Sequence, residues 1–221
     1  MIIKLNLLTL LASALVANAA PLLFDNGAPD LNSPNARGIA IFRSADDFTL
    51  GSAASVSSIR FWMVDQPGNF SGSITYAFYQ NSAGALGSLI SSATVSGITP
   101  LFLNQIPVNV HQIERVDFDL PVPLALDAGT FWLELHDGSS LTTAANANTT
   151  NVLWARVSGD SAGNAKQSAI PNLPSNNIGN ELAFQLFGNS SSATNAVPEP
   201  ATISICAFGL VALAVCRRKL R

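Results

Sequence analysis

Apolar and polar residues alternate along most of the chain between positions 39 and 187, in short runs separated by turn residues. In the clearest run, 74–79, Ile, Tyr and Phe alternate with Thr, Ala and Tyr, which is typical of a strand with one buried face. Further runs predict strands at 39–41, 46–50, 56–64, 89–95, 116–120, 131–135, 152–157 and 182–187. No window between the two chain ends has a convincing helical period.

Turn-forming residues separate these runs at intervals that suit antiparallel sheets: Gly68-Asn69, the stretch 84–87, Asp127-Ala128-Gly129 and Asp137-Gly138. About eight to ten strands without a repeated helix predict an all-β domain over 20–188, an antiparallel, jelly-roll-like β-sandwich. The Gly-, Asn-, Ser- and Pro-rich stretch 158–181 predicts a long irregular connection before the last strand. Residues 189–196 predict a Ser/Asn/Thr linker.

The first nineteen residues differ from this pattern. A single basic residue, Lys4, precedes an apolar core at 7–16 and the small-residue sequence Ala17-Asn18-Ala19. This order predicts a secretory signal peptide, residues 1–19, cut between Ala19 and Ala20. The alternative is a retained membrane helix, but the apolar core is short and no stop-transfer charges follow it.

The last twenty-five residues, 197–221, have three parts. The first is a proline-bearing motif: Val197, Pro198, Glu199 and Pro200. An uncharged apolar run follows at 201–216, which as a helix would reach about 24 Å and predicts a single, rather short transmembrane segment. A basic cluster closes the chain: Arg217, Arg218, Lys219 and Arg221. Because Lys and Arg resist translocation, this cluster should stay in the cytoplasm, with the domain on the other side of the membrane.

These three parts, in this order beside an export signal, resemble the PEP-CTERM sorting signal of exported bacterial proteins, which a membrane enzyme called exosortase handles. The resemblance implies exosortase and the export machinery as partners. It also implies a membrane-anchored precursor that is exported across the inner membrane and deposited at the cell surface or in the exopolysaccharide matrix of a biofilm. Processing near the Pro-Glu-Pro motif would make the transmembrane helix a temporary anchor. The alternative is an ordinary single-span anchor that is never cut.

The body resembles a loose class of uncharacterised exported β-sandwich domains that often carry this tail, through the stretches 45–48, 59–62, 74–81 and 128–133. That resemblance implies a sandwich fold and no established activity. Ice-binding proteins sometimes carry the same tail. However, Thr142-Thr143 and Thr149-Thr150 lie in a loop-like stretch without the regular threonine array that ice binding needs. We therefore expect an ice-binding label to rest on the tail alone.

The net charge of the body limits the partners that it can bind, and the positions of the cysteines limit its chemistry. The whole chain has a net charge of −3, but six basic and thirteen acidic residues lie within 20–196, a net charge of −7 there. Nucleic acid and anionic membrane surfaces are disfavoured, since both require a basic footprint. Both cysteines, Cys206 and Cys216, lie in the tail, so we expect neither a disulfide nor thiolate chemistry in the body.

One motif suggests an enzyme. Residues 159–163 match the Gly-x-Ser-x-Gly nucleophile elbow, with Ser161 as the nucleophile. In that fold the catalytic histidine follows the serine, yet both histidines here, His111 and His136, precede it. The segment after it is too short for a supporting helix. We therefore expect no catalytic residues and no enzyme, with a secreted hydrolase as an alternative.

Several acidic residues could supply oxygen ligands for Ca²⁺: Asp46, Asp47, Asp117, Asp119 and Asp137. Asp117 and Asp119 should share one strand face opposite Phe118, which favours an ordinary solvated face. Neither histidine has a partner at zinc-ligand spacing. Three glutamates, Glu114, Glu134 and Glu181, are too scattered to indicate the paired acids of a glycosidase. We expect no metal and no cofactor, with Ca²⁺ binding as the alternative.

Aromatic pairs indicate a second kind of site. Trp62 follows Phe61 and Trp132 follows Phe131, so one ring of each pair should face the core and the other the opposite side. If Trp62 or Trp132 is exposed beside Tyr79, these rings could stack on sugars of a polysaccharide. The alternative is that a loop or the second sheet covers each tryptophan. If Trp154 is also buried, the glycan-binding hypothesis loses its support in the sequence.

Overall fold

The computed structural model of the chain describes residues 20–32, 35–106, 111–144, 152–159 and 162–191. Within these ranges the chain forms thirteen strands in two antiparallel sheets and contains no helix, so the predicted all-β fold is confirmed. The described part of the chain accordingly has no helix of the length and apolar character needed to cross a membrane. The predicted signal peptide and the tail 197–221 lie outside the described residues.

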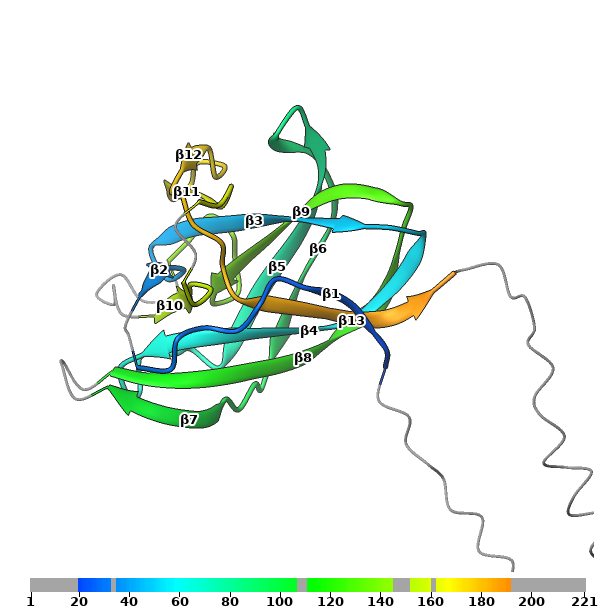
Figure 1. Cartoon of the computed structure of the whole chain (residues 1–221). Coiled ribbons are helices and arrows are strands. Elements are labelled where there is room, and N and C mark those ends of the chain that lie inside the picture. Colours follow the sequence, from blue (N-terminus) through cyan, green and yellow to red (C-terminus); the bar gives the residue numbers. More distant parts are fainter. Residues whose placement is uncertain (1–19, 33–34, 107–110, 145–151, 160–161, 192–221) are drawn as a thin grey trace, which may run out of the picture.

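The two sheets pack face to face (Figure 1). One has seven strands: β1 (Leu22–Asp25), β2 (Ala36–Gly38), β4 (Ala54–Asp65), β7 (Leu101–Ile106), β8 (His111–Leu126), β10 (Val152–Ala155) and β13 (Phe184–Ser190). The other has six: β3 (Phe42–Leu50), β5 (Ser73–Ser82), β6 (Ala85–Ser96), β9 (Gly129–Asp137), β11 (Lys166–Ala169) and β12 (Asn176–Asn177). Of the expected strands, the one at 39–41 is absent, because β2 ends at Gly38 and β3 begins at Phe42.

The strand pairing has the nested order of a jelly roll. β1 pairs with β13, β3 with β9, β4 with β8 and β5 with β6, all antiparallel. Among the eight strands of these pairs, counted in chain order, the first thus pairs with the last, the second with the next to last, and so on inward to the β5–β6 hairpin. The two sheets consequently read β1-β13-β4-β8 and β3-β9-β5-β6, which confirms the jelly-roll prediction.

A core of inward-facing aromatic and aliphatic side chains fills the space between the sheets. Phe48 of β3 lies near its centre, because the ring centroids of Phe24, Phe78, Phe131 and Phe184 are 5.7–6.3 Å from its own. These neighbours come from both sheets, so the tilted and edge-to-face contacts hold the two layers together. The alternation of apolar and polar residues along the strands thus places the apolar side chains between the two sheets, as predicted.

Elsewhere the strands depart from the expected pattern. The stretch 158–181 is not wholly irregular, because it contains β11 and β12; their residues are mostly polar and show no alternation. β8 is longer than predicted and passes through Pro121 and Pro123. Its pairing with β4 is interrupted between Asp119 and Leu124, where the prolines cannot donate to the ladder. β13 extends two residues into the predicted linker.

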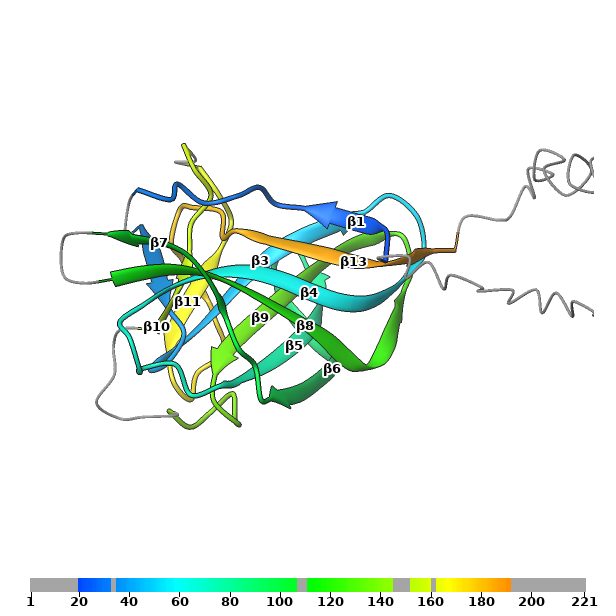
Figure 2. The ribbon, with the colours of Figure 1, turned by 90° about the horizontal axis from the view of Figure 1, so that it is seen from below.

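Both ends of the described domain lie at one end of the sandwich (Figures 1 and 2). The Gly188 N–H donates to the Pro21 carbonyl at 2.9 Å, and the Ser191 N–H donates to the Ala53 carbonyl at 2.8 Å. We call this the tail end. β4 and β9 run away from it and finish at Asp65 and Asp137, at what we call the far end.

Candidate functional site

The outer face of the six-stranded sheet carries a buried polar network around Glu134 of β9. Glu134 is paired with Ala45 on β3 and with Ala77 on β5, and these small side chains leave space above the sheet. Arg43 and Tyr79 reach into that space from the next outward positions on the same two strands. The Arg43 Nε and Nη2 atoms donate to the two Glu134 oxygens at 2.6 and 2.9 Å, and the Tyr79 hydroxyl donates to Oε2 at 2.7 Å.

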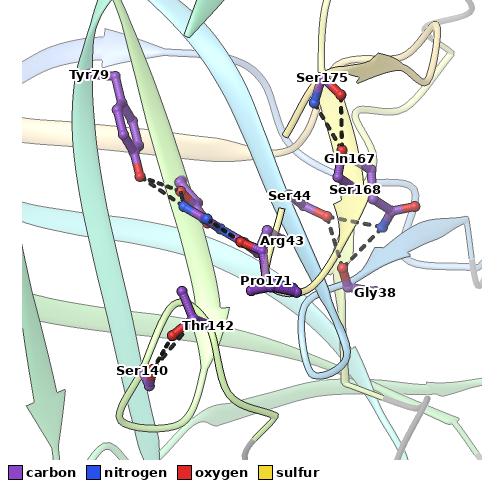
Figure 3. Close-up of polar contacts among 11 residues, drawn as sticks. Gly38, Arg43, Ser44, Tyr79, Ser140, Thr142, Gln167, Ser168, Pro171 and Ser175 are labelled. Carbon is purple, nitrogen blue, oxygen red and sulfur yellow. Dashed lines mark hydrogen bonds and ion pairs between the residues drawn. The ribbon is translucent and has the colours of Figure 1, made fainter. Parts of the chain in front are cut away.

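The guanidinium of Arg43 has further partners. It donates to the Pro171 carbonyl at 2.9 Å and to the Tyr79 hydroxyl at 3.0 Å (Figure 3). Burial alone would lower the pKa of Arg43, but hydrogen bonds and attraction to Glu134 outweigh burial and raise it. Burial, with the charge of Glu134, raises the pKa of Tyr79. Each charge in this network is therefore compensated, which favours a structural role over a catalytic one.

Polar side chains also tie β11 to the sheet. Gln167 donates to the Gly38 carbonyl at 3.1 Å and to the Ser44 hydroxyl at 3.0 Å, while Ser168 contacts Ser175 at 3.2 Å (Figure 3). These contacts explain why a polar segment without alternation still forms a strand. Its order comes from tertiary hydrogen bonds rather than from an apolar face.

The candidate sugar-binding aromatics are all covered. Trp132 is 1% exposed, Tyr79 5%, Trp62 8% and Trp154 0%. The indole N–H of Trp132 donates to Asn81 Oδ1 at 3.0 Å, and the Lys166 ammonium lies 5.3 Å from the ring centroid. The expected opposite orientation of Trp62 and Phe61 is present, because they belong to two different apolar clusters. Nevertheless, a second small cluster buries Trp62, so these residues form no exposed aromatic strip.

His136 lies on the same outer face as Glu134 and is 0% exposed. Within the described ranges, neither ring nitrogen makes a hydrogen bond. Burial, with the nearby Arg43 charge, lowers the pKa of His136 to about 4, and the Asp137 backbone only partly offsets this shift. His136 is thus a neutral imidazole near pH 7. The other histidine of the hydrolase hypothesis, His111, begins β8, and Ser161 lies outside the described residues.

Two of the candidate Ca²⁺ ligands, Asp46 and Asp47, approach Glu181, with one ligand atom from each within 4.8 Å of the others. The Asn26 amide nitrogen donates to Asp46 Oδ2 at 3.0 Å, to Glu181 Oε2 at 3.1 Å and to the Leu182 carbonyl at 2.9 Å. Burial, together with the Glu181 charge, raises the pKa of Asp46 well above its usual range. The Asn26 amide therefore bridges the carboxylates of Asp46 and Glu181.

The other sequence candidates are separate from these groups. Asp117 pairs with Arg60 at 2.5 Å and with Arg115 at 2.7 Å, while Asp119 is exposed, as expected for a solvated strand face. Phe118 between them is buried. The three glutamates remain apart: Glu134 is in the Arg43 network, Glu181 lies near Asp46, and Glu114 lines a depression at the far end.

The sequence reading missed Asp65 and did not associate it with Asp137. Asp65 follows the inward positions Phe61 and Met63 of β4, and Asp137 follows the inward position Leu135 of β9. Each acid thus occupies the last inward position of a strand, just beyond the strand ends predicted at 64 and 135. An acid placed where an apolar side chain belongs was the available signal.

Comparison with known families identifies the C-terminal tail as a sorting motif. Residues 196–221 match the family model of the PEP-CTERM protein-sorting motif. A comparison with curated proteins and another with solved structures each found no match. The resemblance of the tail is therefore confirmed: the chain carries the sorting motif of exported proteins handled by exosortase, whose precursors are membrane-associated and sorted to the cell surface. The described body is an all-β domain ahead of that motif.

Proposed function

We propose that this protein is a non-enzymatic, exported jelly-roll domain that exosortase releases from its tail and deposits at the cell surface or in the exopolysaccharide matrix. The observation that carries the proposal is the sorting motif at 196–221. It directly follows a domain whose last described strand ends at Ser190. A folded domain joined to such a motif by only a few residues has the layout of sorted cargo.

The arrangement of the domain ends supports this role. The chain enters and leaves at the tail end, where Pro21 and Ser191 make backbone hydrogen bonds to neighbouring strands. A precursor held by both terminal segments would thus be tethered through one end only. The far end would point away from the membrane and remain available to the surroundings.

The non-enzymatic part of the proposal rests on the state of the buried polar groups. Glu134, the fully buried glutamate of the outer face, accepts three hydrogen bonds from Arg43 and Tyr79. A carboxylate held in this way has no free oxygen with which to move a proton to or from a substrate. Direct glycan binding is not favoured, because the four candidate aromatic rings are buried.

Tail substitution tests the sorting proposal. In the native host, replacing Glu199 by Ala, or the four basic residues of 217–221 by Gln, should leave the protein as an unprocessed, membrane-associated species. Processing is followed by the apparent mass and by fractionation of membrane and surface material. Ser192→Ala in the linker is the matched control and should be processed normally. Unchanged processing and location of both tail variants would contradict the proposal.

A further inference from the structure

One long strand of the domain has a free edge. β6 is the last strand of the six-stranded sheet and, among the described residues, pairs only with β5 (Figure 2). Register shifts interrupt this pairing before Ser91, whereas the six pairs from Ser91 to Ser96 follow one another regularly. The backbone N–H and C=O groups on the other side of this segment therefore form a regular, unpaired edge of the kind that accepts a further strand.

This edge lacks the features that usually protect one. Proteins block exposed strand edges with charges, prolines, bulges or very short strands. β6 has twelve residues, and none of them is charged or a proline. By contrast, the outermost strands β1, β2 and β12 have only four, three and two residues, and β7 contains a bulge. Within the described ranges, β8 beyond 115 pairs with β4 alone, but it is protected by Asp117, Asp119, Pro121 and Pro123.

The segment that contains β6 is also uncharged. No Asp, Glu, Lys or Arg lies between Asp65 and Glu114, although residues 20–196 together have a net charge of −7. Of the seven large hydrophobic side chains exposed in the described ranges, three belong to β6 and β7: Leu89, Leu101 and Phe102. Two copies of so acidic a domain repel each other, and the repulsion is weakest where both surfaces are neutral. This side of the domain is therefore the one best suited to contact a second copy.

Side chains along β6 would be covered by an added strand. Val95 and Ala93 pair with Ile74 and Tyr76 of β5 and pack against the core, yet both are only partly buried at the margin of the sheet. Ser92, on the opposite face of the strand, is exposed. Because these side chains are small or β-branched and carry no charge, two copies of the segment can lie antiparallel without placing like charges opposite each other.

We propose that β6 is a self-association surface, through which two copies of this chain pair antiparallel along the 91–96 edge. The symmetric contact would join the two six-stranded sheets into one continuous sheet. A basic peptide would find no charge on this edge to attract it, and a glycan would find the four candidate aromatic rings buried. This inference does not depend on the sorting proposal.

The expected dimer is weak. Pairing along six residues buries less than the roughly 800 Å² per partner of a standard interface, so we expect a Kd on the order of 10 µM. Such an affinity leaves the dilute protein monomeric and forms dimers where the protein is concentrated.

Sedimentation equilibrium of the full-length chain in density-matched detergent tests the proposal. The unchanged chain of 23.1 kDa should show a monomer–dimer equilibrium. Ser92→Lys and Ser92→Glu should each raise the dimer Kd at least about tenfold, because like charges then meet across the symmetric edge. Ser52→Lys, in the exposed turn between β3 and β4, is the matched control and should leave the Kd unchanged. All three positions of charge are exposed, so each variant should keep the Tm of the unchanged chain.

Photo-crosslinking provides a second readout. Benzoylphenylalanine in place of Ser92 should give a covalent dimer in which the crosslinked peptide of the second copy contains part of β6. The same group in place of Ser52 should give no dimer. This readout reports the position of the contact, whereas sedimentation reports its strength.

Four results would overturn the assignment. The first is a chain that stays monomeric up to about 200 µM. The second is a dimer that Ser92→Lys and Ser92→Glu leave undiminished, which would place the contact elsewhere in the chain. The third is an equal loss of the dimer in Ser52→Lys, which would make the effect one of net charge alone. The fourth is a crosslinked dimer from position 52 and none from position 92.

Discussion

The outer face of the six-stranded sheet and the far end of the sandwich both bury carboxylates, but they compensate them differently. On the outer face, Glu134 accepts three hydrogen bonds, two of them from the cation Arg43. At the far end, Asp65 and Asp137 each have one oxygen with a donor and one without, among the residues described. A carboxylate whose hydrogen bonds and counter-charge are in place indicates a structural role, whereas a buried oxygen without a donor is costly unless a proton or water compensates it.

The largest expected effect comes from breaking the satisfied network. Glu134→Gln leaves the Arg43 guanidinium buried without its counter-charge, and we expect the free energy of unfolding to fall by about 3–5 kcal/mol. Urea unfolding followed by tryptophan fluorescence measures the change. Asp127→Asn, at an exposed turn, is the control and should stay within about 0.5 kcal/mol of the unchanged protein. A loss below about 1 kcal/mol for Glu134→Gln would mean that water already compensates Arg43.

A smaller effect of opposite sign is expected at the far end. At pH 8, Asp65→Asn should stabilise the protein by about 1 kcal/mol, because the amide keeps an oxygen for the Phe70 N–H and removes a buried charge. The stability of the unchanged protein should fall as pH rises from about 4 to about 7. In that window the unfolded aspartate has released its proton and the folded one still holds it.

Unfolding measured across this pH range should therefore show a shallower decline for Asp65→Asn. Asp137, Glu114 and Asp46 also have raised pKa values, so part of the decline should remain in the variant. Identical pH profiles for the variant and the unchanged protein would show that Asp65 is solvated in the folded state.

His136 should give the smallest effect. Its pKa is lowered to about 4, so the unfolded state binds a proton below about pH 6.5 before the folded state does. Stability linked to His136 is therefore lost as pH falls from about 6.5 to about 4, the reverse of the Asp65 trend. His136→Phe should remove this acid-side loss and change stability at pH 7.5 by less than about 1 kcal/mol. A chemical shift titration of the imidazole with a midpoint near pH 6.5 would contradict the burial argument.

Sequence reasoning recovered the architecture because strands with one buried face are encoded locally. The alternation in 74–79 and the turns around Gly68 and Gly138 predicted antiparallel strands, and these are β5 and its neighbours. It failed for β11, whose Gln167 and Ser168 depend on hydrogen bonds to partners far away in the chain. Such partners cannot be identified from local periodicity.

The candidate sites were harder to predict for the same reason. The alternation correctly placed Trp62 and Trp132 on the faces opposite their phenylalanine neighbours, but their burial depends on segments that fold over those faces. Asp65 and Asp137 are 72 residues apart in sequence, and only the sandwich brings them under one loop. By contrast, the tail could be assigned from sequence because its signal consists of consecutive residues.

The mass of the intact protein recovered from the surface of the native host tests the central claim most directly. If the chain is exported cargo that exosortase processes, the mature species should begin at Ala20 and end before the apolar run 201–216. The acidic jelly-roll domain would then be present without its basic end. A surface species that still ends at Arg221 would contradict the account.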